Sequence, residues 1–142
     1  MRPALQADAL RQRCRRALTE HRRRARADGV TLPYGMAELL QLAGAAVQCA
    51  YCRQPVAWDF QVDHKQPIAR GGRHALANLA IAHAECNRAK GALTAEEYLQ
   101  LLALLRGFHP AAAADVLRRL RAGGRRYRPG RAGLDAPGGR RV

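Results

Sequence analysis

Two closely spaced pairs of metal-binding residue types constrain this sequence more than any other feature. Cys49 and Cys52 form the first pair, with two residues between them. His83 and Cys86 repeat that spacing further along the chain. When two residues separate the members of a pair, a tight turn points both side chains toward the same ion. Two such pairs supply the four ligands of a closed zinc site. We therefore predict a structural Zn²⁺ ion that supplies much of the folding energy of a small domain.

The context of the cysteines favours a metal over a disulfide. A lone Cys-x-x-Cys pair also occurs in redox proteins, but that use needs a thioredoxin-like βαβ context, which the sequence lacks. Cys14 has no nearby partner, and we expect a free thiol. No apolar run reaches the roughly 18 residues of a membrane span, and no signal peptide is recognisable. We expect a cytoplasmic protein, because thiols stay reduced in that compartment.

Positive charge is concentrated at the two ends of the 142-residue chain, whose formal net charge is +14. Residues 1–28 carry nine arginines against three acids, and residues 118–142 carry nine arginines against one acid. Residues 29–117 carry seven basic and seven acidic side chains. Two cationic arms on a neutral core predict a polyanionic partner, although a solvated arginine face is the simpler interpretation of any single run.

Hydrophobic periodicity predicts a mostly helical α+β chain. Residues 56–64 alternate, with Val56, Trp58, Phe60 and Val62 on one face, and this pattern is typical of a strand. A capping box at Thr94 marks one helix start. We expect strands over 56–64 and 79–82, and helices over 3–28, 36–47, from near Cys86 to Gly91, from Thr94 to Gly107 and from Pro110 to Gly123. On the first helix, His21 is expected to be a surface residue.

This pattern divides the chain into four parts. They are a basic N-terminal helix at 1–29, a central domain with the zinc site and flanking helices at 30–108, a C-terminal helix at 109–122, and an arginine- and glycine-rich tail at 123–142. The tail has almost no apolar content, and we expect it to be disordered.

A second set of residues lies inside the loop that the zinc ion would close. Asp63 and His64 end the predicted strand, and the chain has two asparagines, Asn78 and Asn87, both in this stretch. Phosphodiester hydrolysis needs an activated water and a Lewis acid near the scissile phosphate. A neutral histidine is a competent base near pH 7, and Mg²⁺ accepts few protein ligands because it keeps waters. If these residues are not catalytic, the asparagines cap turns and Asp63 is solvated.

Taken together, these motifs resemble the His-Asn-His (HNH) endonucleases of the zinc-containing, McrA-like type. The resemblance covers residues 49–91 and implies a ββα-metal (His-Me finger) core. It implies His64 as the general base and Asn78 as the residue that ties down the loop and orients the base. It further implies Asp63 and Asn87 as ligands of a catalytic divalent ion, Mg²⁺ or Mn²⁺. His83 departs from the family, in which cysteine is usual at this position.

The resemblance makes nucleic acid the expected partner, with DNA as the leading substrate and RNA left open. Arg88 and Lys90 stand where the family contacts phosphate. The basic residues that we expect to bind nucleic acid are Arg70, Arg73, Arg88, Lys90, Arg125, Arg126 and Arg128.

Two other functions compete with a metal-dependent endonuclease. One is a zinc-stabilised nucleic-acid-binding module without catalysis, and the other is a protein-interaction domain whose arginines serve solubility. A binding module has no need for the combination of Asp63, His64 and Asn87.

Overall fold

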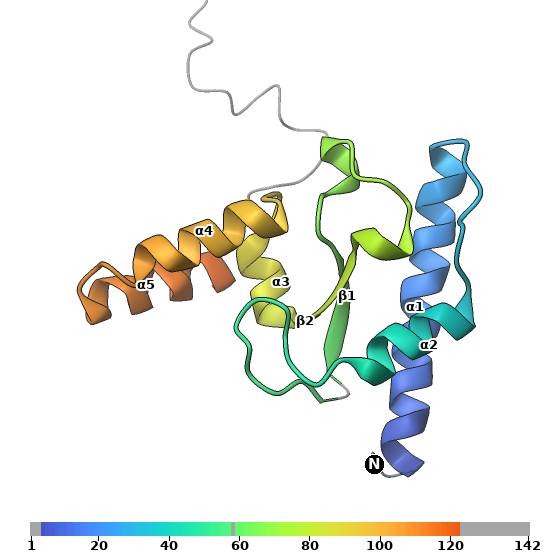
Figure 1. The fold of residues 1–142 in the computed structure, drawn as a ribbon, viewed down its shortest axis with the longest axis horizontal. Helices are drawn as coiled ribbons and strands as arrows, with labels where there is room; N and C mark the ends of the chain where they lie inside the picture. Colours follow the sequence, from blue (N-terminus) through green and yellow to red (C-terminus); the bar gives the residue numbers. More distant parts are fainter. Residues whose placement is uncertain (1–3, 58, 123–142) are drawn as a thin grey trace, which may run out of the picture.

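A short antiparallel hairpin and the helix that follows it lie at the centre of a mostly helical chain (Figure 1). The structure is a computed structural model, and it describes residues 4–57 and 59–122. The elements are α1 (Ala4–Ala27), α2 (Met36–Ala45), β1 (Phe60–His64), the 3₁₀ turns η1 (Ile68–Arg70) and η2 (Leu76–Asn78), β2 (Leu79–His83), α3 (Ala84–Lys90), α4 (Ala95–Leu105) and α5 (Pro110–Ala122). The predicted mostly helical α+β class with a ββα core is confirmed.

Strand alternation gives the two faces of the hairpin different neighbours. Phe60 and Val62 pack in an apolar cluster with residues of α1 and α2. Asp63 lies on the opposite face, where its carboxylate meets a side chain of α3. Because successive side chains of a strand point to opposite sides, His64 returns to the face that α1 covers. The two adjacent residues Asp63 and His64 therefore have different surroundings.

Helix α1 packs on the hairpin along one narrow face. Cys14, Leu18, His21 and Ala25 recur every three or four residues and are all buried, as expected for the core-facing stripe of a helix. Cys14 is a free thiol, as predicted. The prediction that His21 is a surface residue is wrong, because this side chain is 4% exposed. It occupies the same helical face as Leu18 and Ala25.

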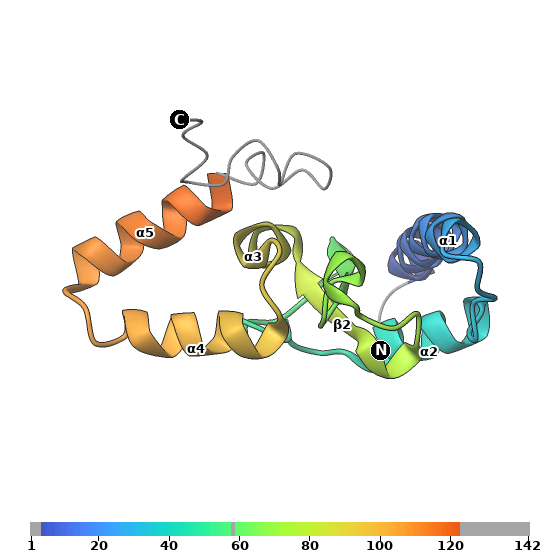
Figure 2. The same cartoon turned by 90° about the horizontal axis from the view of Figure 1, so that it is seen from above.

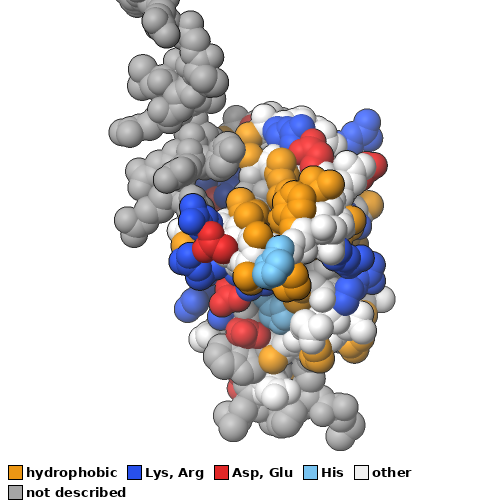
Figure 3. Space-filling view, turned by 90° about the vertical axis from the view of Figure 1, so that its left-hand side faces the viewer, with side chains coloured by type: hydrophobic (Ala, Val, Ile, Leu, Met, Phe, Trp, Pro, Cys, Tyr) orange, Lys and Arg blue, Asp and Glu red, His pale blue; other side chains and the backbone are white. Residues whose placement is uncertain are grey.

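The C-terminal helices pack on the other side of the hairpin. Thr94 caps α4, because its Oγ1 accepts a hydrogen bond from Glu97 N at 3.1 Å and the Glu97 carboxylate accepts one from Thr94 N. Helix α5 folds back and packs on α3. Figure 2 shows α1 at one end of the molecule and α5 toward the other, both in the upper part of the view, with α3 and the hairpin between them. Leu104, near the end of α4, and Phe108, in the turn that follows, are exposed apolar side chains. Figure 3 shows that apolar side chains gather on this end of the molecule.

The first strand is shorter than predicted. It begins at Phe60 and not at Val56, because its partner β2 ends at His83, which pairs with Phe60. The preceding segment is used elsewhere, since Val56 N donates to Val47 O at 3.1 Å and Pro55 bridges to Gln48.

Other predicted boundaries differ little from the structure. Helix α2 ends at Ala45, two residues before the predicted end, and α3 begins at Ala84. The tail at 123–142 lies outside the described residues. Within the described part of the chain, no helix is both long and apolar enough to cross a membrane.

Gly72 allows the loop after β1 to fold tightly on itself. A Cβ atom at this position would lie 2.0 Å from the carbonyl oxygen of Gln66. We expect Gly72→Ala to destabilise the protein by at least about 1–3 kcal/mol, the usual cost of overpacking. Gly44→Ala is the matched control, because its Cβ meets nothing within 4 Å and an exposed helical glycine gains about 1 kcal/mol on this change. Thermal unfolding should show Tm shifts of opposite sign.

Candidate functional site

The predicted zinc ligands converge in the fold. The thiol and imidazole ligand atoms of Cys49, Cys52, His83 and Cys86 all lie within 4.8 Å of one another. Cys49 and Cys86 are buried, with exposed fractions of 0% and 3%. Three thiols and one imidazole form a donor set that suits tetrahedral Zn²⁺.

The orientation of His83 fits a metal ligand. Its Nε2 lies 3.0 Å from the carbonyl oxygen of Pro55, which only accepts hydrogen bonds, so Nε2 carries the proton. The lone pair is then on Nδ1, which lies 3.2 Å from Cys52 Sγ within the cluster. A partner that fixes the tautomer in this way is typical of metal-binding histidines. The residues present therefore fit a structural zinc ion.

The turn that carries Cys49 and Cys52 is held by hydrogen bonds within itself, to β2 and, through Tyr51, to Asp63. Arg53 N donates to Cys49 O at 3.1 Å, and Ala50 N donates to Ile81 O of β2 at 2.9 Å. Tyr51, between the two cysteines, is buried, and its hydroxyl donates to Asp63 Oδ2 at 2.5 Å. The zinc cluster and the candidate catalytic carboxylate are therefore joined by a single side chain.

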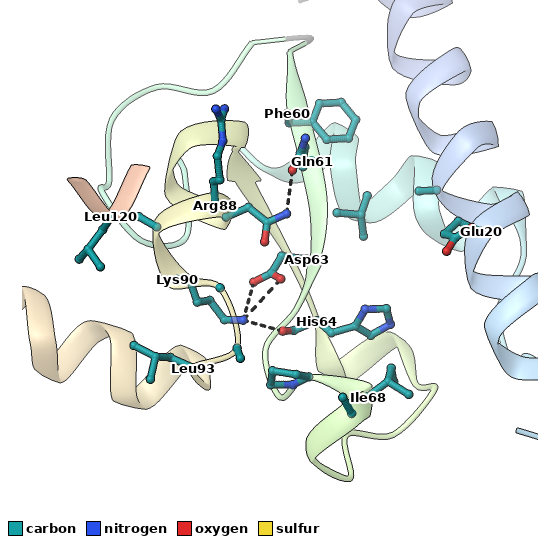
Figure 4. A pocket seen from close by; sticks show the side chains of 18 of the residues that line it. Glu20, Phe60, Gln61, Asp63, His64, Ile68, Arg88, Lys90, Leu93 and Leu120 are labelled. Atoms are coloured by element: carbon teal, nitrogen blue, oxygen red, sulfur yellow. Dashed lines mark hydrogen bonds and ion pairs between the residues drawn. The ribbon is translucent and has the colours of Figure 1, made fainter. Parts of the chain in front are cut away.

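Asp63 and Lys90 form a buried ion pair at the floor of a cleft. Lys90 Nζ lies 3.2 Å from Asp63 Oδ2 and 3.5 Å from Oδ1, and it donates to the carbonyl oxygen of His64 at 3.0 Å (Figure 4). Lys90 is 2% exposed. Burial raises the pKa of the Asp63 carboxyl above its ordinary value, although Tyr51 and Lys90 oppose the shift. Of its two oxygens, Oδ1 has the longer contact with the ammonium group.

Asn87 stands on α3 beside this pair. Its Nδ2 donates to Gln61 Oε1 at 2.7 Å, which fixes the orientation of the amide and turns Oδ1 away from Gln61. Asp63 and Asn87 both line the cleft. Carboxylate and amide oxygens are ligands that Mg²⁺ accepts, so the donor types fit a divalent ion, with Lys90 as a cationic neighbour.

His64 lies among three segments of the chain. Its imidazole ring points toward α1 and away from Asp63 and Lys90 (Figure 4). Its ring centroid is 4.7 Å from that of His21 on α1 and 6.4 Å from that of His74 in the loop. Burial lowers the pKa of His64 to about 4, and the neighbouring His21, Arg24, His74 and Lys90 add to the shift. The imidazole is therefore neutral at pH 7 and able to accept a proton.

Asn78 holds the loop between the strands closed. Its Nδ2 donates to the carbonyl oxygens of Gln66 and Arg73, both at 3.0 Å, and its Oδ1 accepts from Gln66 N at 2.9 Å. The backbone of Asn78 also accepts from Lys65 N at 2.7 Å. These bonds pin the residues that follow His64.

The cleft has a volume of about 1860 Å³ and is lined by α1, β1, α3 and α5. Its acidic lining residues are Glu20 and Asp63. Its basic lining residues are Arg13, Arg16, Arg23, Arg24, Arg70, Arg88, Lys90, Arg118 and Arg119. Arginines of α1 and of α5 therefore line one cationic groove, which suits a polyanion.

The residues expected to bind nucleic acid have different positions in the fold. Arg88 is exposed and lines the cleft. Arg70 also lines it, but its guanidinium is held by Glu97 at 2.6 and 2.7 Å. Arg73 is exposed outside the cleft lining. Lys90 differs from expectation, because its ammonium group is buried against Asp63 and does not face the solvent.

The predicted nucleic-acid-binding residues of the tail, Arg125, Arg126 and Arg128, lie outside the described residues.

Sequence reasoning missed three residues of this site. Tyr51 carried no signal beyond its place between two cysteines. His21 was identifiable from its spacing to Leu18 on the apolar face of α1. His74 lies in an irregular loop, where no periodicity identifies a side chain that folds inward.

Residues 49–93 of the 142-residue chain match the family model described as HNH endonuclease. The match contains the four zinc-ligand candidates together with Asp63, His64, Asn78 and Asn87. It leaves α1, α2, α4 and α5 outside. No curated protein and no solved structure matches the chain.

The cluster predicts about one equivalent of zinc per chain, as a four-ligand site requires. Cys52→Ser should lose the metal and much of the fold, because structural zinc contributes folding energy directly. Cys14→Ala is the matched control and should keep both, since Cys14 lies on α1 outside the cluster. Elemental analysis and circular dichroism measure the outcome. A Cys52→Ser protein that is folded and binds zinc at full occupancy would contradict the assignment.

Proposed function

We propose that this chain, whose residues 49–93 are similar to the HNH endonucleases, is a metal-dependent endonuclease that hydrolyses phosphodiester bonds in DNA. The observation that carries the proposal is that Asp63, His64 and Asn87 all line one arginine-rich cleft, with His64 on the face of β1 opposite to Asp63. The Cys and His cluster further supports the zinc-containing, McrA-like type. The nuclease domain is then residues 30–108, and reduced thiols for zinc favour a cytoplasmic location.

His64 is the general base in this proposal. A depressed pKa keeps the imidazole neutral, so it accepts a proton from an attacking water at pH 7. Its Nε2 is buried, so we assign the proton transfer to Nδ1. Asn78 restrains the residues after His64 and so limits the motion of the base.

Asp63 and Asn87 hold the catalytic divalent ion in this proposal. Mg²⁺ or Mn²⁺ supplies Lewis-acid stabilisation of the scissile phosphate and of the leaving oxygen. Tyr51 and Lys90 keep the Asp63 carboxylate in place by bonding Oδ2. Asn87 presents its amide oxygen because Gln61 holds its nitrogen.

The groove suits a nucleic acid because arginines of two helices line it, and we propose DNA as the substrate. Arginines of α1 and α5 contact the phosphates on either side of the hydrolytic site, and Arg88 contributes from the floor. Phosphate contacts position the duplex without reading its sequence.

A non-catalytic nucleic-acid-binding module is the second candidate function. The Asp63–Lys90 ion pair favours it, because the ammonium group already neutralises the carboxylate that would hold a metal ion. Incubation of the zinc-loaded protein with supercoiled plasmid and Mg²⁺ or Mn²⁺ separates the two functions. Binding without cutting under every condition would favour the module.

His64→Ala should reduce cleavage by about 10²–10⁴, the usual contribution of a positioned base. Zinc content and DNA affinity should stay close to wild type. Asp63→Ala should also abolish cutting, with partial recovery in excess Mn²⁺, because its defect lies in metal binding. His109→Ala is the control, since this histidine caps α5 through Ala111 N. A His64→Ala protein that cuts at the wild-type rate would exclude the proposed base.

The groove makes a separate prediction about salt dependence. Arg16 and Arg11 are both exposed on α1, but Arg16 lines the cleft and Arg11 does not. Arg16→Gln should lower the slope of log affinity against log salt by about 0.9, the value for one phosphate contact. Arg11→Gln should leave the slope unchanged. Both slopes are measured by fluorescence anisotropy. Equal slopes for the two variants would show that the duplex does not bind along this part of the groove.

A further inference from the structure

Two buried ring nitrogens, one of the candidate base and one of a neighbouring histidine, have no hydrogen-bond partner among the described residues. They are Nε2 of His64 and Nδ1 of His74. His64 is 7% exposed and the side chain of His74 is 9% exposed, so neither nitrogen is satisfied by bulk solvent. A buried polar atom without a partner destabilises the fold, and one shared partner would satisfy the nitrogens of both rings.

A direct hydrogen bond between the two rings is excluded by their separation. The ring centroids are 6.4 Å apart. Each ring nitrogen lies about 1.2 Å from its own centroid, so the two nitrogens are at least about 4 Å apart, beyond hydrogen-bond range. One water molecule bridges two nitrogens that are up to about 6 Å apart, which is two hydrogen-bond lengths, and a polar site with two unsatisfied partners is where buried water is found.

The other ring nitrogen of His74, Nε2, is held by a carboxylate. Its Nε2 lies 2.6 Å from Oδ2 of Asp28. An ionised carboxylate only accepts hydrogen bonds, so Nε2 of His74 carries a proton, and in the neutral ring Nδ1 offers a lone pair. Asp28 is itself held at the end of α1, where its backbone N donates to Arg24 O at 3.0 Å.

The geometry points to His74 and Asp28 as positioning residues that orient His64 through a bridging water. The inference rests on the proposed role of His64 as the base. Nε2–H of His64 donates to the water, the water donates to Nδ1 of His74, and Nε2–H of His74 donates to Asp28. Each of these three hydrogen bonds pairs one donor with one acceptor.

The relay fixes the tautomer of the base. With its proton on Nε2, His64 presents the Nδ1 lone pair to the cleft. During hydrolysis the attacking water transfers a proton to Nδ1 while its oxygen bonds to the phosphorus. The bond between the phosphorus and the 3′-oxygen breaks, and the 3′-oxygen leaves. The imidazolium keeps its Nε2 proton throughout, so no proton has to pass along the relay.

His21 does not play this part, although it is closer to His64. Its ring packs against His64 with centroids 4.7 Å apart. Its Nδ1 is already 2.8 Å from the hydroxyl of Tyr34. His21 is therefore a packing neighbour, whereas His74 has a buried nitrogen still to satisfy.

Kinetics of three variants test the relay. His74→Phe keeps the ring volume and removes Nδ1, and it should lower the single-turnover cleavage rate about 10- to 100-fold, the effect typical of losing a partner that orients a functional histidine. Asp28→Ala should lower it by less. The double variant should be no slower than His74→Phe alone, because residues in series are not additive. DNA affinity should change no more than in the charge control Asp8→Ala.

Additive effects of the two substitutions, or a His74→Phe rate equal to wild type, would overturn the relay. His109→Phe controls for the loss of a histidine at an exposed position. If the wild type itself cuts no nucleic acid, the proposed function fails, and the relay is then decided by the spectroscopic measurement.

Proton NMR of the zinc-loaded full chain provides that measurement. A hydrogen-bonded, buried Nε2–H of His64 exchanges slowly, so a downfield imidazole signal bonded to nitrogen should be visible. Its absence from His64→Ala assigns the signal to His64 and not to the Nε2–H of His74. The assigned signal should disappear in His74→Phe and persist in His109→Phe. A wild type without the signal, or a signal that survives in His74→Phe, overturns the inference. So does a second equivalent of bound metal that is lost with His74, because an ion would then bridge the rings.

Discussion

The cluster of Cys49, Cys52, His83 and Cys86 is the constraint on which the remaining structure depends. It joins the turn that carries Cys49 and Cys52 to the junction of β2 and α3. The second apolar cluster is built around two of its cysteines and continues to Tyr98 on α4. A hairpin of two five-residue strands buries too little apolar surface to be stable alone. The metal site supplies the missing connection between strands, turn and helix.

The same constraint reaches the candidate catalytic residues through Tyr51. Its hydroxyl bonds Asp63, and Lys90 completes the pair from α3. The carboxylate is therefore positioned by groups that depend on the zinc-site fold. Strand alternation directs the next residue, His64, to the opposite face, where α1 and the loop surround it. One residue step along β1 thus separates the ion-binding candidate from the candidate base.

Helix α1 has two roles in this arrangement. Its exposed arginines form a wall of the groove, and its buried face supplies His21 against His64. Asp28, just beyond its end, holds His74. The surroundings of the base are therefore built in part by residues outside the matched range 49–93. A helix that looks like a charged arm in the sequence is in the structure a component of the site.

The sequence by itself determined the ligand cluster, the ββα order and the alternation of β1, because each depends on spacing within one segment. It also identified Asp63, His64, Asn78 and Asn87, which the fold brings to the cleft or to the loop beside it. Tertiary structure alone decided that β1 begins at Phe60, because a strand extends only as far as its partner, and β2 ends at His83. It likewise decided that Lys90 is buried and that His74 meets Asp28, 46 residues away. Such contacts depend on how separate segments pack in space, and the periodicity of one segment does not determine that packing.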